Sequence, residues 1–383
     1  MANDWLGVLG GGQLGRMFCH AAQKLGFRVC VLDPTRDGPA GCVAERQIVA
    51  AYDDPEALAQ LGQSCRAVTT EFENVPARSL AQLAANCPVR PDAQAVAVAQ
   101  DRAREKAFLR ECGVEVAPHV AIVDAGSLEK LDESLFPAIL KTSQLGYDGK
   151  GQRAVAEPGD VRAAWEELGR VRCVLERRLP LRRELSVIVA RGADGATAVF
   201  PVVENEHRGG ILAVSTMPAR VSAQTALAAQ GIALRVAAGL SYVGVLCVEL
   251  FELDDGRLFA NEMAPRPHNS GHATIDACAV SQFEQQARVL AGLPLGEPRL
   301  LAPAVMLNLL GEIWFARDGS PREPAFDQVL AVPGACLHLY GKHEARRGRK
   351  MGHVTILGET VEDAHVRAAR VARILGIEPP FQV

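Results

Sequence analysis

A predicted β-hairpin that brings two glutamates together constrains the fold of this chain more than any other feature. Residues 243–253 alternate in polarity and are rich in β-branched and apolar side chains, which is typical of a strand. The pair Asp255-Gly256 favours a two-residue type I′ turn. Counting outward from this turn places Glu249 opposite Glu262, and opposed Cβ atoms on one sheet face lie about 5 Å apart.

Two ionised carboxylates at this separation, each among apolar neighbours, repel one another. They need a shared proton or a divalent cation, and Glu262→Gln is then expected to stabilise the metal-free protein slightly. Oxygen-only ligands on a rigid hairpin suit Mg²⁺, which usually shares its shell with substrate phosphates. Two alternatives stay open: a solvated hairpin face, or a register slipped by one residue, which would move Glu249 to the other face.

Composition points to a globular enzyme with two or three domains. The chain has 383 residues, 48% of them hydrophobic and 22% charged, and a net charge of −4, so no global basic field recruits nucleic acid. The first residues lack the basic region of a signal peptide, and no apolar run approaches the roughly 20 residues that span a bilayer. The ten cysteines form no CxxC motif, which indicates reduced thiols in the cytoplasm rather than a disulfide or zinc framework.

The N-terminal region has the alternation of a doubly wound α/β domain. A strand at 5–9, a glycine loop, a helix to about 25 and a strand at 27–32 are expected first. A strand at 67–70, a helix at 78–85, a short strand at 88–90 and a helix at 94–100 follow. The helix at 101–112 is expected to leave this domain.

Two further regions are expected after residue 118. The first combines a strand at 138–142, a glycine-rich turn, a helix at 161–168 and a strand at 173–176. The second is strand-rich from residue 183, with strands at 183–191 and 196–203. It also has a helix at 224–238 and a last helix near 361–375.

The glycine loop fits the dinucleotide fingerprint, with Gly10, Gly12 and Gly15 in GxGxxG and Asp33 at the end of the second strand. A dehydrogenase must therefore be considered. The physics is more general, because glycines let backbone N–H groups approach any anion at a helix N-terminus. A tight turn with close helix–strand packing is the structural alternative.

Three other segments carry polar groups suited to a nucleotide. Glu73 follows a strand and could accept from an amine or a ribose hydroxyl, or cap the next helix. Lys141 ends a strand before the glycines of residues 146–151, which resemble a mobile cover for phosphates, although an ordinary hairpin turn is also possible. Glu176 and Glu184 flank a turn and could hold ribose or adenine, or be solvated.

Two segments are more ambiguous. His207 ends the polar cluster at 204–207, and a lone histidine of this kind is more often structural than catalytic. The basic run at 342–350 lacks aromatic interleaving, so a phosphate clamp fits better than a nucleic-acid patch, with a solvated loop as the alternative.

In order and spacing, these motifs resemble those of the ATP-grasp superfamily and, within it, the 5-carboxyaminoimidazole ribonucleotide synthetases of purine biosynthesis (the ATPase subunit of phosphoribosylaminoimidazole carboxylase). The resemblance covers nearly the whole chain. The matching segments are GGGQLGRM at 10–17, the TxEFENVP-like 70–76, QDR at 100–102 with Lys106, GYDGKGQ at 146–152, APRPHNSGH at 264–272, and GK at 341–342 with GRKMGH at 348–353.

The resemblance implies a set of site residues. Mg²⁺ would be held by Glu249 and Glu262. The residues implied to bind ATP are Arg102, Lys141, Gly146, Tyr147, Asp148, Gly149, Lys150, Gly151, Gln152, Glu176, Arg177, Arg178, Leu179, Glu184, His207, Asn261 and Glu262. Those implied to bind the ribonucleotide are Gln13, Leu14, Glu73, Tyr147, Asp148, Arg266, His268, Asn269, Lys342, Arg349 and Lys350. Those implied to act in catalysis are Arg266, His268, Tyr147, Asp148 and Lys342.

The resemblance also implies an α/β ATP-grasp fold with three domains. These are an N-terminal Rossmann-like (pre-ATP-grasp) domain at 1–105, a small α+β lid at 106–182 and a C-terminal antiparallel-sheet α+β domain at 183–383. The implied reaction joins ATP, bicarbonate and 5-aminoimidazole ribonucleotide through carboxyphosphate, in a cytoplasmic homodimer that passes its product to a separate mutase. No nucleic-acid or membrane partner is expected.

Three rival functions stay open. The glycine fingerprint alone would fit a dehydrogenase. A formate-using transformylase or a biotin carboxylase would share the nucleotide chemistry and differ in acceptor. A non-catalytic nucleotide-binding module would make the paired carboxylates incidental.

Overall fold

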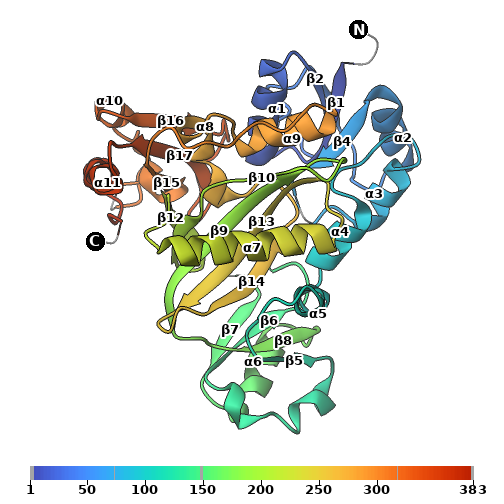
Figure 1. Ribbon diagram of the computed structural model, residues 1–383, viewed down its shortest axis with the longest axis vertical. Coiled ribbons are helices and arrows are strands. Elements are labelled where there is room, and N and C mark those ends of the chain that lie inside the picture. The colour runs from blue at the N-terminus through green and yellow to red at the C-terminus, as the bar shows by residue number, and fades with distance from the viewer. Residues whose placement is uncertain (1–3, 73, 147–149, 317, 381–383) are drawn as a thin grey trace.

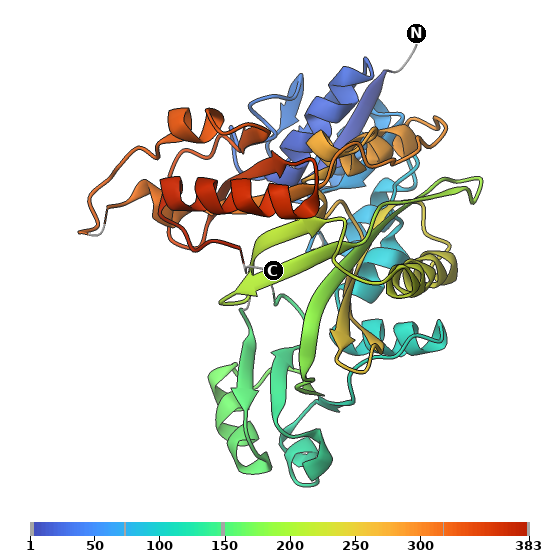
Figure 2. The same cartoon turned by 60° about the vertical axis from the view of Figure 1, so that its left-hand side comes forward.

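Three β-sheets organise the protein (Figure 1). The computed structural model describes residues 4–72, 74–146, 150–316 and 318–380. Within those residues, one sheet is parallel and N-terminal, a second forms a separate lobe, and the third runs through the C-terminal half. The turned view shows the small lobe hanging below the large sheet (Figure 2).

The N-terminal sheet is parallel, as the doubly wound pattern predicted, and its strand order is β3-β2-β1-β4. Its strands are β1 (Trp5–Leu9), β2 (Arg28–Leu32), β3 (Arg46–Ile48) and β4 (Ala67–Thr70). Its helices are α1 (Gln13–Lys24), α2 (Pro55–Ser64), α3 (Ala77–Leu83) and α4 (Ala93–Ala99), and α5 (Arg102–Glu111) then leads away. The expected strand at 88–90 is wrong, because only Val89 makes an isolated bridge, to Val68.

The lobe of Figure 2 holds an antiparallel sheet in the order β5-β8-β6-β7. We call it the lid sheet. Its strands are β5 (His119–Ile122), β6 (Ala138–Thr142), β7 (Gln152–Val155) and β8 (Cys173–Arg177), with helix α6 (Val161–Glu167) and the short helices η1 (Ala125–Leu128), η2 (Glu133–Leu135) and η3 (Pro158–Asp160). A core around Leu140, Leu175 and Trp165 holds the lobe together.

The large sheet is antiparallel in the order β14-β13-β9-β11-β12-β15-β17-β16, and β10 pairs with β9. Its strands are β9 (Leu181–Arg191), β10 (Thr197–Val199), β11 (Val203–Arg208), β12 (Ile211–Met217), β13 (Gly244–Leu253), β14 (Leu258–Ala264), β15 (Ala304–Leu310), β16 (Ala335–Leu339) and β17 (Lys350–Leu357). The accompanying helices are α7 (Ala223–Gly239), α8 (Thr274–Ala277), α9 (Gln282–Leu290), α10 (Phe326–Leu330) and α11 (Val361–Leu375), with η4 (Asn269–Gly271) and η5 (Gly311–Trp314). The single strand expected at 196–203 is wrong, since β10 and β11 are separate there.

The hairpin of β13 and β14 pairs Glu249 with Glu262, as predicted, but by a different route. The turn is not a two-residue loop: the N–H of Leu253 donates to the carbonyl of Arg257 at 3.0 Å, which leaves three residues between them. That shift is reversed by a bulge between Glu249 and Leu250, where Asn261 is the extra residue. The expected register is therefore restored at the glutamates.

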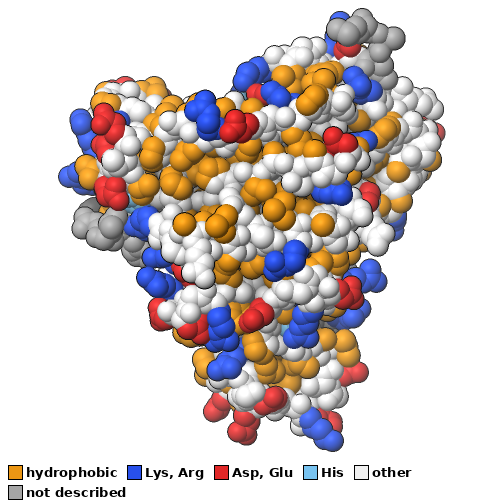
Figure 3. Space-filling model, viewed as in Figure 1, with side chains coloured by type: hydrophobic (Ala, Val, Ile, Leu, Met, Phe, Trp, Pro, Cys, Tyr) orange, Lys and Arg blue, Asp and Glu red, His pale blue; other side chains and the backbone are white. Residues whose placement is uncertain are grey.

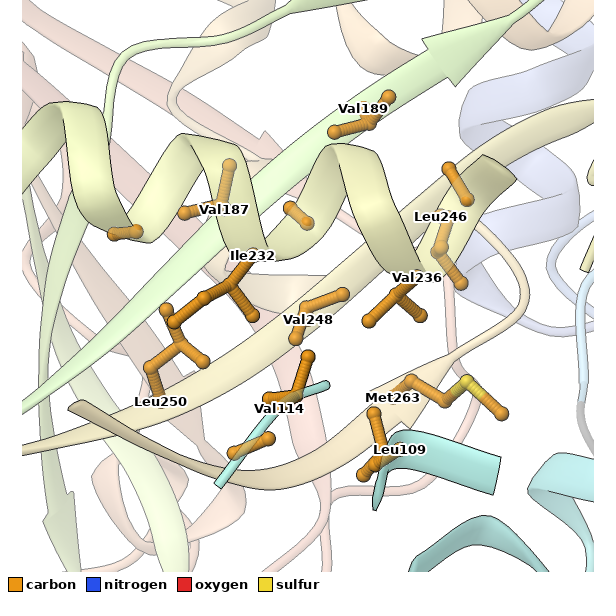
Figure 4. Close-up of a cluster of buried hydrophobic side chains, with 14 of the residues drawn as sticks. Leu109, Val114, Val187, Val189, Ile232, Val236, Leu246, Val248, Leu250 and Met263 are labelled. Atoms are coloured by element: carbon orange, nitrogen blue, oxygen red, sulfur yellow. The ribbon is translucent and has the colours of Figure 1, made fainter. Parts of the chain in front are cut away.

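Helix α7 covers one face of the hairpin and β9, and α5 closes the cluster from below (Figure 4). Ile232 and Val236 of α7 pack over Val187 and Val248, whose side chains are fully buried. Because each buried apolar side chain contributes about 1.5–3 kcal/mol, this cluster holds the hairpin rigid.

Helix α9 packs against the N-terminal sheet and helix α1. Its apolar residues Phe283, Ala287 and Leu290 share a core with α1, β1 and β2. Lys24 and Glu284 add an ion pair of 2.9 Å between α1 and α9. This packing places the loops after β1 and β4 beside the loop that follows β14.

The surface is mixed. In Figure 3 apolar side chains gather on the middle of the viewed face, around and above α7, whereas charged side chains are frequent on the lid lobe. Across the described residues, no helix combines the length and apolar character that a membrane span needs. All ten cysteines are free thiols.

Candidate active site

A cavity of about 360 Å³ lies where the three sheets meet. Its walls come from the start of α1, the segments after β4 and β6, helices α4 and α5, the β11–β12 turn, the hairpin, the loop after β14 and the start of β17. The residues expected to bind ligands that line it are Gln13, Leu14, Arg102, Gly146, His207, Glu249, Glu262, Arg266, His268, Asn269 and Lys350. Thus one cavity brings together residues implied to bind the metal, the nucleotide and the ribonucleotide.

The two hairpin carboxylates face this cavity, and each has its own cation. Nε2 of His268 lies 2.9 Å from Oε1 of Glu249, and a guanidinium nitrogen of Arg102 lies 2.7 Å from Oε2 of Glu262. Burial opposes ionisation of Glu262, but Arg102 outweighs it and holds the pKa of that carboxyl below its usual range. Burial likewise disfavours the imidazolium of His268, but Cys247 and Glu249 raise its pKa. The glutamates therefore need no shared proton.

A second buried group of charges lies behind Arg102. The carboxylate of Glu176 lies 3.0 Å from Nζ of Lys141 and 3.2 Å from Nζ of Lys106. Lys141 also donates to Oδ1 of Asn261 at 3.5 Å, so the lid sheet contacts the hairpin bulge. Lys141 and Asn261 were implied to bind ATP, and the structure brings them together.

The loop after β14 is held by helix α9. The side chain of Gln282 accepts from the N–H of His268 at 2.8 Å and donates to its carbonyl at 2.6 Å. The side chain of Arg266 lines the cavity beside it. Asn269 is 8% exposed, and neither its amide nitrogen nor its amide oxygen has a partner among the described residues. A buried, unpaired amide that lines a cavity is available to a ligand.

The glycine loop contradicts the expectation that its N–H groups approach a ligand anion. Glu71 accepts from the N–H of Gly12 at 2.6 Å and from that of Gly15 at 2.7 Å, and Asp33 accepts from that of Gly11 at 2.6 Å. A Cβ on Gly12 would lie 2.4 Å from Oε1 of Glu71. The glycines thus allow the protein's own carboxylates, Glu71 and Asp33, to approach the loop closely.

Asp33 is also unavailable as a ribose ligand of the dinucleotide type. Its Oδ1 accepts from the N–H of Thr35 at 2.7 Å. Its Oδ2, which binds the N–H of Gly11, also accepts from the hydroxyl of Tyr52 at 2.6 Å. The dehydrogenase alternative therefore loses both of its sequence features.

His207 and Glu184, both implied to bind ATP, form a pair beside a second cavity. Nδ1 of His207 lies 2.8 Å from Oε2 of Glu184, and both residues border a second cavity of about 220 Å³. Burial lowers the pKa of His207, but Glu184 outweighs it, so the net pKa is raised. Gln152 pairs with Lys141 across β7 and β6. Glu73, Tyr147, Asp148 and Gly149 lie outside the described residues.

Several implied residues do not line the main cavity. The N–H groups of Arg177 and Arg178 donate to Pro118 and Pro137, both at 2.8 Å, as part of the lid sheet. Leu179 follows them, and Lys150 and Gly151 lead into β7. In the tail, Lys342 donates to the carbonyl of Lys350 at 2.6 Å and Arg349 to that of Glu344 at 2.8 Å. Of the three predicted clamp residues, Lys350 alone borders the cavity.

The sequence interpretation missed Glu71, Glu105, Lys106, His272 and Gln282. Glu105 accepts from the N–H of Met263 at 2.6 Å, and burial, followed by the charge of Glu262, raises its pKa to about 8. His272 is buried and its ring lies 4.8 Å from that of His353. Glu71, Lys106 and His272 lie inside the matched motifs, so the motifs could have drawn attention to them. Gln282 lies in no matched motif, and nothing in the sequence indicated its role.

The donor set fits Mg²⁺ but not a metal held by protein alone. Across the described ranges, no group of three or more His, Cys, Asp or Glu residues gathers to hold a metal ion. Glu249 and Glu262 supply two carboxylates to one cavity, and Mg²⁺ is usually bound by one or two carboxylates together with substrate phosphates.

Comparisons with known proteins agree with this architecture. The model of the ribonucleotide synthetase preATP-grasp domain matches residues 3–100. That of the ATP-grasp domain matches 107–283, and that of the phosphoribosylaminoimidazole carboxylase C-terminal domain matches 304–367. These matches confirm the predicted fold class.

Relatives extend over nearly the whole chain. The N5-carboxyaminoimidazole ribonucleotide synthase of Brucella melitensis is 48% identical over 353 residues, which are 91% of this chain and 95% of that protein. The solved synthetase of Thermus thermophilus has a TM-score of 0.89 at 39% identity, covering 98% of this chain and 100% of that one. The Aspergillus clavatus enzyme, solved with ADP and 5-aminoimidazole ribonucleotide, has a TM-score of 0.89 at 32% identity, covering 98% and 99%. By its domains, its identity to these proteins and its fold, this chain belongs to the N5-carboxyaminoimidazole ribonucleotide synthase family of ATP-grasp ligases.

Proposed function

We propose that the protein uses ATP to carboxylate 5-aminoimidazole ribonucleotide with bicarbonate. The products are N5-carboxyaminoimidazole ribonucleotide, ADP and phosphate, in purine biosynthesis. One observation carries the proposal: a single cavity joins the hairpin carboxylates, the cations Arg102 and Lys350, and the loop of Arg266, His268 and Asn269. Together these groups fit a nucleotide, a metal and an anionic acceptor in contact.

The nucleotide half lies between the lid sheet and the hairpin. Glu249 and Glu262 would hold Mg²⁺, which when bound neutralises charge on the transferring phosphoryl group. Arg102, which lines the cavity, and Lys141, which reaches the hairpin at Asn261, would contact the phosphates. Phosphoryl transfer depends mainly on positioning and electrostatics, which these groups supply.

The acceptor half lies between the glycine loop and the loop after β14. Bicarbonate is a poor electrophile, and its phosphorylation gives carboxyphosphate. The guanidinium of Arg266 would hold this anion, or the CO₂ it releases, by its planar fork. The exocyclic amine of the ribonucleotide then attacks the carbon. Gln13, Leu14 and Asn269 would orient the ribonucleotide, and Lys350, Lys342 and Arg349 its phosphate.

The organisation of the protein in the cell is part of the proposal. We expect a cytoplasmic homodimer whose product goes to a separate mutase. The boundaries at 105 and 182 are also proposed. The three sheets support a division near these positions, because their strands occupy residues 5–70, 119–177 and 181–357, although β9 begins one residue before the second boundary.

The test is phosphate release with each candidate acceptor, with and without bicarbonate. Release that needs both 5-aminoimidazole ribonucleotide and bicarbonate is expected. Release that depends instead on formate, or on biotin with bicarbonate, would replace the acceptor and keep the ATP-grasp chemistry. Absence of release with every acceptor, together with tight nucleotide binding, would leave a non-catalytic nucleotide-binding module.

A further inference from the structure

Lys106 is a buried lysine to which neither the proposed chemistry nor the motif gives a role. It lies in α5 and is 1% exposed. Its Nζ is 3.2 Å from Oε1 of Glu176 and 3.5 Å from the carbonyl oxygen of Asn261. Asn261 is the bulge residue of the hairpin, so its carbonyl leaves the regular ladder and is open to this contact.

Lys106 and Lys141 share the carboxylate of Glu176. Oε2 of Glu176 is 3.0 Å from Nζ of Lys141, so the two oxygens are divided between the two ammonium groups. The carboxylate is 3% exposed and Lys141 is 9% exposed. Two cations therefore neutralise one anion in a place where an unpaired charge is very unfavourable.

This sharing matters because Lys141 must do two things. It is bound to Glu176 here, and under the proposed function it contacts the nucleotide phosphates. Without a second cation, a turn of Lys141 toward the phosphates would leave Glu176 ionised, buried and unpaired.

We propose that Lys106 is a positioning residue that keeps Glu176 neutralised, so that Lys141 is free to exchange its carboxylate partner for a phosphate of the nucleotide. The inference rests on the proposed role of Lys141 in phosphate binding. It does not depend on the acceptor. Burial lowers the pKa of Lys106 whereas the charge of Glu176 raises it, so the ammonium is maintained by the partner it neutralises.

The test compares ligands with and without phosphates. In Lys106→Met, Lys141 is the remaining cation of the pair and stays on Glu176. Calorimetry with ADP should then show affinity weakened by about tenfold or more, whereas adenosine should bind within about twofold of wild type. A merely structural role would weaken both ligands alike, which would overturn the proposal.

A double variant sharpens the test. Lys106→Met/Glu176→Gln removes the anion that retains Lys141. Because the resemblance implies that Glu176 itself binds ATP, the reference is Glu176→Gln, and adding Lys106→Met to it should change ADP affinity by less than about threefold. If Lys106→Met weakens ADP binding as much in the Glu176→Gln background as in wild type, the proposal is wrong. Should Lys106→Met not fold, the double variant is compared with Glu176→Gln alone: tenfold weaker ADP binding than that of Glu176→Gln contradicts the role.

Lys24→Met is the matched control. It makes the same change in an ion pair, at 2.9 Å from Glu284, on a lysine side chain that is 72% exposed and lies outside the cavity. Its affinities for ADP and adenosine should equal those of wild type. Because all these measurements are of binding, a wrong acceptor would alter phosphate release and leave the ADP–adenosine contrast intact.

Discussion

Carboxylates bind at the glycine loop and lie on the hairpin, but the groups that bind them differ. At the loop, backbone N–H groups of Gly12 and Gly15 bind Glu71 at 2.6 and 2.7 Å. At the hairpin, side chains of His268 and Arg102 bind Glu249 and Glu262. Backbone donors cannot turn away without unfolding the helix start, whereas side-chain cations can rotate toward another anion.

The difference separates a structural anion site from an exchangeable one. The loop has the spacing of a nucleotide fingerprint, yet its donors are used within the protein. The hairpin has no fingerprint, yet its carboxylates line the cavity and can exchange their partners for a metal. Ligand-binding capacity thus depends on whether the partners of a charge can move.

Glu262→Gln should give the largest effect. Loss of one carboxylate from the pair weakens Mg²⁺ binding, and ATP turnover should fall by about three orders of magnitude in a phosphate-release assay. Near-normal release at moderate Mg²⁺ would contradict the metal role. The structure does not support the small gain in stability expected from relieved repulsion, because Glu262 pairs with Arg102 at 2.7 Å and the substitution removes this charged partner. The melting temperature should fall slightly.

Gly12→Val tests the glycine loop, where backbone N–H groups hold the carboxylate in place. A Cβ at this position would meet Oε1 of Glu71 at 2.4 Å and displace it. Since Gln13 and Leu14 follow directly, the KM for the ribonucleotide should rise by more than tenfold while ADP affinity changes little. Equal loss of both ligands, or tight NAD binding by wild type, would show that the loop serves an adenine nucleotide. Glu45→Gln is the control, because Glu45 accepts from the N–H of Val29 at 2.7 Å in the same domain, away from the cavity.

Alanine variants of three cations in the basic tail test the proposed phosphate clamp. Replacing Lys342, Arg349 or Lys350 by Ala should raise the KM for the ribonucleotide by about tenfold, since a charge-assisted hydrogen bond contributes roughly 1.5–3 kcal/mol. Lys350, which lines the cavity, should show the largest rise. The KM for ATP should stay constant. Unchanged ribonucleotide kinetics with reduced affinity for RNA would instead identify a nucleic-acid patch.

Glu105 gives the smallest effect, as a pH dependence. Its pKa is raised from 4.5 to about 8 by burial and by Glu262. Between these values the folded protein binds more protons at this site than the unfolded chain, so stability falls as pH rises. Glu105→Gln keeps an acceptor for the N–H of Met263 and removes the titration. Its stability relative to wild type should therefore increase by about 1 kcal/mol from pH 5 to pH 6 in urea unfolding. A constant difference would mean that Glu105 is ionised throughout.

Local patterns predicted the elements well, and one prediction was right through two errors that cancel. The helix at 361–375 and the strands at 67–70 and 138–142 have the expected bounds, because their apolar periodicity and caps are local. The pairing of Glu249 with Glu262 is confirmed, but the turn is one residue longer than expected and the bulge at Asn261 compensates. Neither departure has a signal in the residue types alone.

The contacts that could not be predicted from the sequence join segments that are distant along the chain. Glu71 reaches Gly12 across 59 positions, and Gln282 holds His268 from a separate helix. Lys106 meets Glu176 because the lid sheet packs on α5 and the hairpin. Such pairs follow from the packing of one domain on another, which composition and periodicity do not specify.

The most direct test of the exchangeable hairpin is the gain in ADP affinity on adding Mg²⁺, measured by calorimetry in wild type, Glu249→Gln and Glu262→Gln. Wild type should bind ADP at least about tenfold more tightly with Mg²⁺ than with EDTA, and both variants should lose most of that gain. If the variants keep the full Mg²⁺-dependent gain, the hairpin carboxylates do not hold the metal, and the account of this site is wrong.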